Sequence, residues 1–170
     1  NMNLKILSLL IIEVCILLPD VCYAFFSKDV HLLNMQNGLA DNTVSAVYKD
    51  KEGFVWFGTR NGLSRYDGRQ ITNFEQSNSY PSISNLKEVF DGVLAFVDNG
   101  VFSAFDLKKE RFLSVVSSSG QGIPSRGMLQ RNDSLVWVIS GSELHLMKRC
   151  ASKEGELRLR VQEKYTGWNN

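Results

Sequence analysis

Two carboxylates stand close together in the segment Asp50-Lys51-Glu52-Gly53. A pair of carboxylates can act as general acid and general base, as in glycoside hydrolysis. Both, however, lie in a charged, Gly-ended stretch that precedes an apolar run, which is the composition of a turn. Carboxylates in turns are normally solvated. We therefore expect a turn here and no catalytic residue.

Hydrogen-bonding side chains follow in Arg60-Asn61-Gly62. Arg60 and Asn61 are the candidates for ligand binding, because their donors suit a sugar hydroxyl. Asn-Gly between two apolar runs is also a hairpin signal, since both residues tolerate a positive φ. The hairpin is the stronger interpretation. Trp56 and Trp137 carry rings that could stack on a sugar, but their place in a repeat, described below, predicts that both are buried.

The remaining reactive residue types form no recognisable site. His31 and His145 lie far apart in the sequence and have no Cys partner. Cys150, expected in a loop over 148–155, has no His or second Cys at metal-ligand spacing. Gly120-Gln121-Gly122 lacks the strand–helix context of a phosphate-binding loop. The sequence therefore predicts no metal, no cofactor and no enzyme active site in this segment.

The charge balance excludes another class of partner. The 170 residues include 19 Lys and Arg against 18 Asp and Glu, a net charge of +1. A nucleic-acid-binding domain normally carries a basic face or stripe. We expect no binding of nucleic acid by this segment.

Residues 1–24 differ from the rest of the chain. Lys5 precedes an apolar run over 6–18 that only Glu13 interrupts, and Cys22 and Ala24 suit signal-peptidase cleavage after residue 24. The run is short for a membrane span. We expect a helical signal peptide and export to the periplasm, with an uncleaved anchor or a misassigned start as alternatives.

A repeat of about forty residues fills the remainder, residues 25–170. Leu63 and Tyr66 recur as Phe102 and Phe105 at one common spacing, and Trp56 recurs as Trp137 after two such spacings. Each unit contains four short apolar runs separated by turn signals such as Asn-Gly and Asp-Gly. Four strands in a unit of this length is the pattern of a β-propeller blade. The predicted fold is all-β, a partial propeller of about three four-stranded antiparallel blades at 43–74, 86–116 and 127–161.

The opening unit resembles a known family. The resemblance rests on Gly38-Leu39-Ala40-Asp41, on Glu52-Gly53-Phe54-Val55-Trp56-Phe57-Gly58, and on Asn61-Gly62-Leu63-Ser64-Arg65-Tyr66-Asp67-Gly68. These residues are similar to the two-component-regulator propeller repeat. Gly122-Ile123-Pro124-Ser125 echoes the first motif two repeats later. The turn at Asp50, followed by Trp56, also resembles the aspartate-box turns of sialidase-type propellers, which are structural.

The resemblance implies a sensory role. The repeat is typical of the periplasmic half of hybrid two-component sensor histidine kinases of Bacteroides-type bacteria. It implies an oligosaccharide ligand, further blades and sensor domains as partners, an inner-membrane anchor, and a homodimer in the full-length form. Kinase activity would belong to the full-length protein. The alternatives are a periplasmic propeller enzyme of the lyase or glycosidase type, and a non-functional truncated remnant of a sensor.

Three blades are too few to close a ring, since propellers use about four to eight. Residues 30–33 have the composition of a strand that closes the ring against the last blade. We therefore expect the chain to be a fragment or a truncated product of a longer sensor.

Overall fold

The computed structural model describes residues 31–75 and 83–167. The chain divides into two compact units, Asn1–Leu32 and Leu33–Asn170, and every strand of the described residues belongs to the second unit. The predicted signal peptide lies outside the described residues. Within the described part of the chain, no helix has the length and apolar character needed to cross a membrane.

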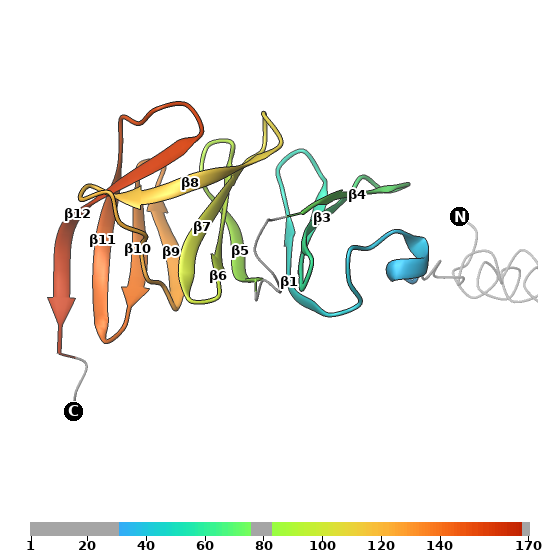
Figure 1. The fold of residues 1–170 in the computed structure, drawn as a ribbon, viewed down its shortest axis with the longest axis horizontal. Coiled ribbons are helices and arrows are strands. Elements are labelled where there is room, and N and C mark those ends of the chain that lie inside the picture. Colours follow the sequence, from blue (N-terminus) through green and yellow to red (C-terminus); the bar gives the residue numbers. More distant parts are fainter. Residues whose placement is uncertain (1–30, 76–82, 168–170) are drawn as a thin grey trace, which may run out of the picture. The chain divides into compact units, whose positions relative to one another are not determined.

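The first blade is a four-stranded antiparallel sheet in the order β1-β2-β3-β4 (Figure 1). Its strands are β1 (Val44–Lys49), β2 (Val55–Thr59), β3 (Gly62–Tyr66) and β4 (Ile71–Phe74). A short 3-10 helix, η1 (Met35–Asn37), precedes it. The predicted Asn-Gly hairpin is confirmed, because Thr59 pairs with Gly62 across a tight turn in which Gly62 has a φ of +106°.

Eight further strands supply the second and third blades. The second contains β5 (Ile83–Phe90), β6 (Val93–Asp98), β7 (Val101–Asp106) and β8 (Arg111–Ser117). The third contains β9 (Gly127–Asn132), β10 (Leu135–Ser140), β11 (Glu143–Cys150) and β12 (Glu156–Thr166). Consecutive strands within each blade are antiparallel. The first strands lie next to one another, β1 against β5 and β5 against β9.

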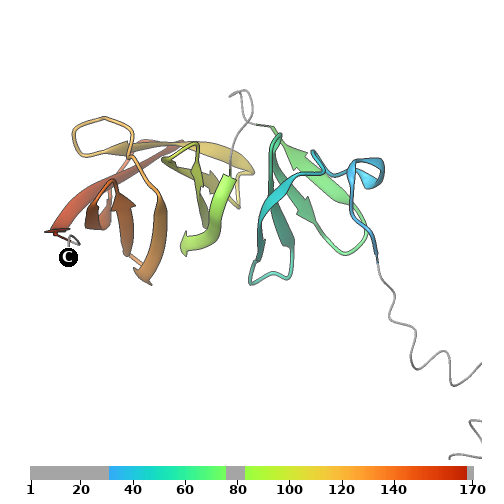
Figure 2. The same cartoon turned by 90° about the horizontal axis from the view of Figure 1, so that it is seen from below.

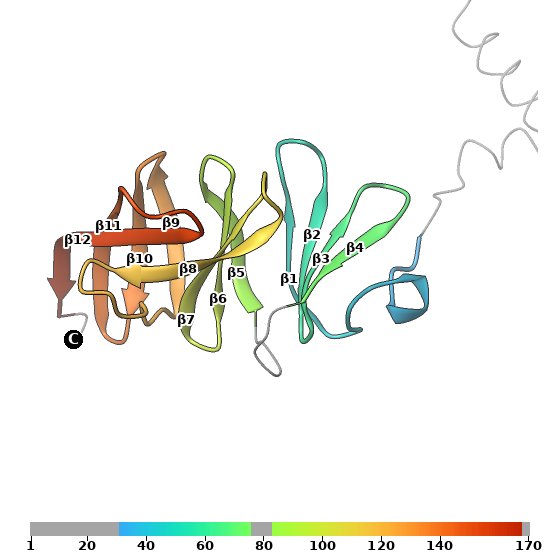
Figure 3. The same ribbon diagram turned by 45° about the horizontal axis from the view of Figure 1, so that its top comes forward.

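The outer strands of the second and third blades differ from the expected arrangement. β12 pairs in parallel with β8, from Glu156 opposite Ser114 to Leu159 opposite Ser117, so the two blades form one eight-stranded sheet. Figures 2 and 3 show these two strands side by side. Both extend beyond the predicted ends of their blades, at residues 116 and 161. Their pairing satisfies backbone groups that two free sheet edges would leave exposed.

The strand pairing confirms the repeat. Gly58 pairs with Leu63, Val97 with Phe102, and Ile139 with Leu144. These pairs are related by the same two spacings that relate the apolar runs in the sequence. The hairpins formed by the second and third strands therefore have one register in all three blades.

The core consists of two clusters, one at each junction between blades. At the first junction, buried side chains of the first two blades pack together: Trp56, Leu63, Ile83, Leu86, Leu94, Phe96 and Phe105. The cluster at the second junction joins the second and third blades and includes Ala95, Phe102, Ile123, Val136, Val138, Met147, Leu157 and Leu159. A strand that is apolar on both faces fits this arrangement, since an inner blade buries both.

The expected ring-closing strand is not formed in this structure. His31, Leu32 and Leu33 have no regular secondary structure, and Val30 lies outside the described residues. Pairing of this segment with a last blade remains a prediction.

Candidate functional site

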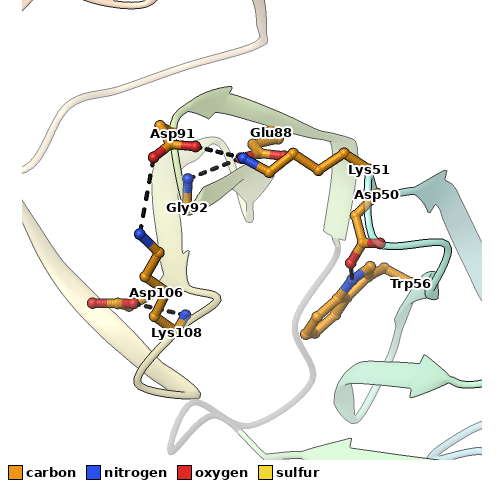
Figure 4. A network of polar contacts seen from close by, with 8 residues as sticks. All are labelled: Asp50, Lys51, Trp56, Glu88, Asp91, Gly92, Asp106 and Lys108. Atoms are coloured by element: carbon orange, nitrogen blue, oxygen red, sulfur yellow. Dashed lines mark hydrogen bonds and ion pairs between the residues drawn. The ribbon is translucent and has the colours of Figure 1, made fainter.

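A group of charged side chains lies beside a cavity where the first blade meets the second (Figure 4). The cavity has a volume of about 180 Å³. Its apolar wall consists of Phe54, Trp56 and Leu107, and its rim carries Lys51, Glu52, Arg65 and Lys108. This cleft between two repeats, which has an aromatic floor and a charged rim, is the candidate site.

Asp50 holds the turn that leads to this floor. Its Oδ1 accepts from the backbone N–H of Phe54 at 2.9 Å, and its Oδ2 accepts from the indole Nε1 of Trp56 at 2.7 Å. Both Asp50 and Trp56 are buried. Each carboxylate oxygen of Asp50 therefore has a structural donor, as the predicted turn requires. Glu52 is exposed, whereas Asp50 is buried.

The two hydrogen bonds of Asp50 are expected to stabilise the fold. Substitution Asp50→Ala leaves the buried N–H of Trp56 without its acceptor, so we expect the free energy of unfolding to fall by about 1–3 kcal/mol. Asp50→Asn retains only one acceptor oxygen and should lie between the alanine variant and wild type. Urea denaturation followed by circular dichroism measures both. Equal stability of all three proteins would contradict this role of the carboxylate.

An ion-pair network crosses the junction on the rim. Lys51 of the first blade donates to Asp91 and lies 3.5 Å from Oε1 of Glu88, both in the second blade. Glu88 Oε1 also accepts from the backbone N–H of Gly92 at 2.8 Å. Lys108 lies 4.0 Å from Asp91 on its other side. The charges of the network are compensated within the protein, which favours a structural contact between blades.

These contacts shift the titration of the exposed groups. The hydrogen bond and charge of Lys51 hold the pKa of Asp91 below its ordinary value. The same contact with Asp91 raises the pKa of Lys51. A carboxylate with a lowered pKa in the folded state stabilises the fold above the unfolded pKa of about 3.9, and that stabilisation is lost as the pH falls through the folded pKa.

We therefore expect acid to weaken this junction. Below about pH 4, the wild-type chain should lose stability more steeply than the Asp91→Asn variant, because the variant has no carboxylate to protonate. Unfolding curves at several pH values measure the difference, and NMR titration of Asp91 measures its pKa directly. Parallel pH profiles for the two proteins would contradict the coupling.

Arg65 closes the junction over the aromatic rings. Its guanidinium lies 4.9 Å from the ring centroid of Phe54 and 5.6 Å from that of Trp56, and its Nη1 donates to Glu110 of the second blade at 2.6 Å. Cation–π contacts of this kind stabilise by about 0.5–2 kcal/mol. The residue is a fixed part of the interface.

The two ligand candidates from the sequence are placed apart from this cleft, in the β2–β3 turn. Both side chains are exposed. Asn61 uses its side-chain amide to donate to the carbonyl of Ala40 at 3.1 Å, so its donor holds the opening segment of the blade. The structure does not bring Arg60 and Asn61 together with the residues of the cleft.

Two expectations about the third blade are corrected. Trp137 is half-buried, whereas Trp56 is 1% exposed, because Phe105 of the following blade covers Trp56 at a ring distance of 5.5 Å. Trp137 contacts Tyr165 of its own blade instead. Cys150 is the last residue of β11 and does not lie in a loop.

The histidines have separate surroundings. His145 pairs with Glu143 through Nε2 at 2.9 Å, and Glu143 also accepts from Lys164. The described residues contain no group of three or more His, Cys, Asp or Glu placed to hold a metal ion.

The contacts that cross between blades were not predicted from the sequence. Lys51 pairs with Asp91, and Arg65 pairs with Glu110, and the two residues of each pair stand about one repeat apart in the sequence. Charges of opposite sign about one repeat apart are the signal that could have found them, because such positions become neighbours when blades stack.

Comparison with known proteins agrees with this geometry. Residues 38–61 match the model of the two component regulator propeller. The chain carries a two-component regulator propeller repeat. The matched residues run from the opening Gly38 segment through β2 to the β2–β3 turn. No curated protein matches the chain in sequence.

Solved structures extend the comparison to the whole run of blades. The extracellular domain assigned to the hybrid two component system BT3049 of B. thetaiotaomicron superposes with a TM-score of 0.59 at 19% identity, covering 81% of this chain and 18% of that one. The extracellular domain assigned to the one component system BT4673 of the same organism gives 0.57 at 16% identity, covering 82% and 21%. The predicted fold, a partial β-propeller, is confirmed. The chain spans about a fifth of the length of these similar domains.

Proposed function

We propose that this chain is an extracytoplasmic sensory segment of a two-component system, and that it recognises an oligosaccharide or supports the blades that do. The observation that carries the proposal is the regulator propeller repeat at 38–61, set in a run of blades that superposes on extracellular domains of such systems. The mature segment is exported by residues 1–24 to the periplasm. The full-length form is anchored in the inner membrane and joined to further sensor domains.

The polar groups of the blade junction have structural partners, which does not favour catalysis. Asp50 is occupied by two donors from its own turn, and Lys51 is paired with Asp91. A glycosidase needs two carboxylates facing one bond across a space of about 5–10 Å. Asp50 is held by its turn, so it and Glu52 do not form such a pair. We therefore propose that the segment is not an enzyme and that phosphoryl transfer belongs to the kinase part of the full-length protein.

Ligand binding is tested on the purified chain with a panel of short oligosaccharides, their component monosaccharides, and amino acids as non-sugar controls. A ligand that binds the folded state raises the thermal midpoint, and the rise grows with its concentration relative to the Kd. We expect one oligosaccharide class to raise the midpoint and the amino acids to leave it unchanged. A rise with the amino acids alone, or with no compound, would contradict glycan sensing by these blades.

The enzyme alternative is tested in the same samples. A sensor releases its ligand unchanged, whereas a lyase or glycosidase shortens it. Chromatography of each oligosaccharide after prolonged incubation is expected to show the intact compound. New reducing ends or unsaturated sugars that accumulate with time would replace the sensory assignment by an enzymatic one.

A further inference from the structure

Each blade has two apolar faces, and the repeat register identifies them. One face turns toward the following blade and carries Trp56 in the first blade, Ala95 in the second and Trp137 in the third. The opposite face turns toward the preceding blade. We call these the forward face and the rear face.

Both junctions join a forward face to a rear face at equivalent positions. At the first, Trp56 packs in one buried cluster with Leu94 and Phe96 of β6. At the second, Ala95 packs in one cluster with Val136 and Val138 of β10. Val136 occupies the repeat position of Leu94, and Val138 occupies that of Phe96. The same pair of surfaces is therefore used twice.

The forward face of the third blade has no blade against it among the described residues. Leu129 pairs with Trp137, and Ile139 with Leu144, on this face. Leu129 is 59% exposed and Ile139 is 45% exposed. A hollow of about 410 Å³ lies beside them, lined by Ile139, Gly141, Ser142, Glu143 and Leu144. At the equivalent place in the second blade, Val97 and Phe102 are buried.

The rear face of the first blade is the complementary surface. Val55 and Phe57 stand where Leu94 and Phe96 stand in the second blade, and both are half-buried. Val47 stands where Leu86 stands, and it is 61% exposed. The opening segment covers the outer strands of this face, where Asn73 donates to the carbonyl of Gly38 at 2.9 Å. Among the described residues, no comparable segment covers the part formed by β1 and β2.

We propose that the forward face of the third blade docks the rear face of a blade of this same repeat, and that in solutions of this chain the blade is the first blade of a second copy. Two copies joined head to tail supply six blades, within the range of about four to eight that closes a propeller. Three copies would exceed that range. The contact is heterologous and closes after two copies, so the assembly is a discrete dimer and not a fibre. This inference concerns assembly and does not depend on the proposed sensory function.

The test uses two variants that place opposite charges on the two surfaces. Leu129→Lys alters only the forward face, and Val47→Glu alters only the rear face. Both positions are exposed in one copy, so each variant should keep the wild-type circular dichroism spectrum and thermal midpoint. Ser119→Lys, in the exposed turn after β8, is the matched control for an added charge.

Analytical ultracentrifugation of the chain purified from the periplasm of an expression host gives the answer. Wild type and Ser119→Lys are expected to sediment with twice the mass of one copy. Each face variant alone should weaken the dimer by about tenfold or more, because an unpaired charge is buried at both contacts. An equal mixture of the two face variants should recover a dimer, since one of its two contacts is wild type and the other opposes the introduced charges.

Three outcomes would overturn the proposal. A wild-type chain that stays monomeric at its highest soluble concentration shows that no second copy docks. A dimer that survives Val47→Glu uses a like-to-like contact between forward faces. A mixture that stays as monomeric as its two components excludes the head-to-tail contact.

Discussion

Replacing Trp56 by alanine is expected to lower the free energy of unfolding by about 3–5 kcal/mol, the range for large aromatic residues in a core. The ring is buried between two blades, 5.6 Å from the ring centroid of Phe74 in its own blade and 5.5 Å from that of Phe105 in the next. The substitution also leaves the buried carboxylate of Asp50 without its indole donor. The cost of the cavity and the cost of the lost hydrogen bond therefore both lower the free energy of unfolding.

Trp137→Ala is the matched control, because the two residues occupy equivalent positions two blades apart. Trp137 is half-buried and has no ring from a following blade among the described residues, so its removal should cost clearly less. Urea denaturation of both variants, followed by circular dichroism, gives the comparison. An equal loss for the two variants would contradict the role of the blade junction in burying Trp56.

Gly58→Ala is expected to destabilise by about 1–3 kcal/mol, the usual cost of overpacking a core. A Cβ added to Gly58 would lie 2.5 Å from Cγ2 of Ile83 and 3.3 Å from Cβ of Ala46. Ile83 begins β5 of the second blade, so the glycine lets the two blades approach closely. Gly122→Ala is the control, because the nearest heavy atom to its added Cβ lies 4.0 Å away.

The clash at Gly58 has a specific partner, which a double-mutant cycle can identify. Ile83→Ala removes the methyl group that the new Cβ meets. The combined variant should therefore lose less stability than the sum of the two single losses, by at least about 0.5 kcal/mol. Simple additivity of the two losses would show that the added methyl disturbs something other than the approach of Ile83.

Much of the fold follows from local signals. Phe54-Val55-Trp56-Phe57 is apolar on both faces and lies between a turn and an Asn-Gly pair, which together predict a strand inside a stack of sheets. The regular spacing of the repeat locates the equivalent strands without any structural information. The turn at Asp50 was also readable, since its charged residues precede an apolar run directly.

The departures from expectation arise where neighbouring strands and blades decide the outcome. Trp137 was expected to be buried because it occupies the repeat position of Trp56. Burial at this position, however, depends on the ring that the next blade contributes. Cys150 was expected in a loop over 148–155, yet pairing with Arg158 keeps it in β11. The parallel pairing of β8 with β12 has no local signal. Contacts between blades depend on geometry that a single repeat does not encode.

The candidate site likewise depends on contacts that the sequence does not reveal. Arg60 and Asn61 were chosen for their hydrogen-bonding chemistry, and the structure uses the amide of Asn61 to hold the carbonyl of Ala40. The cleft instead takes its charged rim from Lys51 and Lys108, both of which lie near Asp91. In the sequence alone these residues look like ordinary solvated charges, because their partners become neighbours only when the blades stack.

The sensory assignment is tested most directly by sequencing the transcript that carries residues 1–170 in its source cell. We expect an open frame that continues into further repeats of the same kind, a membrane span and a histidine kinase core. A stop codon after Asn170, followed by unrelated sequence, would contradict it and leave the blades without the signalling half on which the proposed function rests.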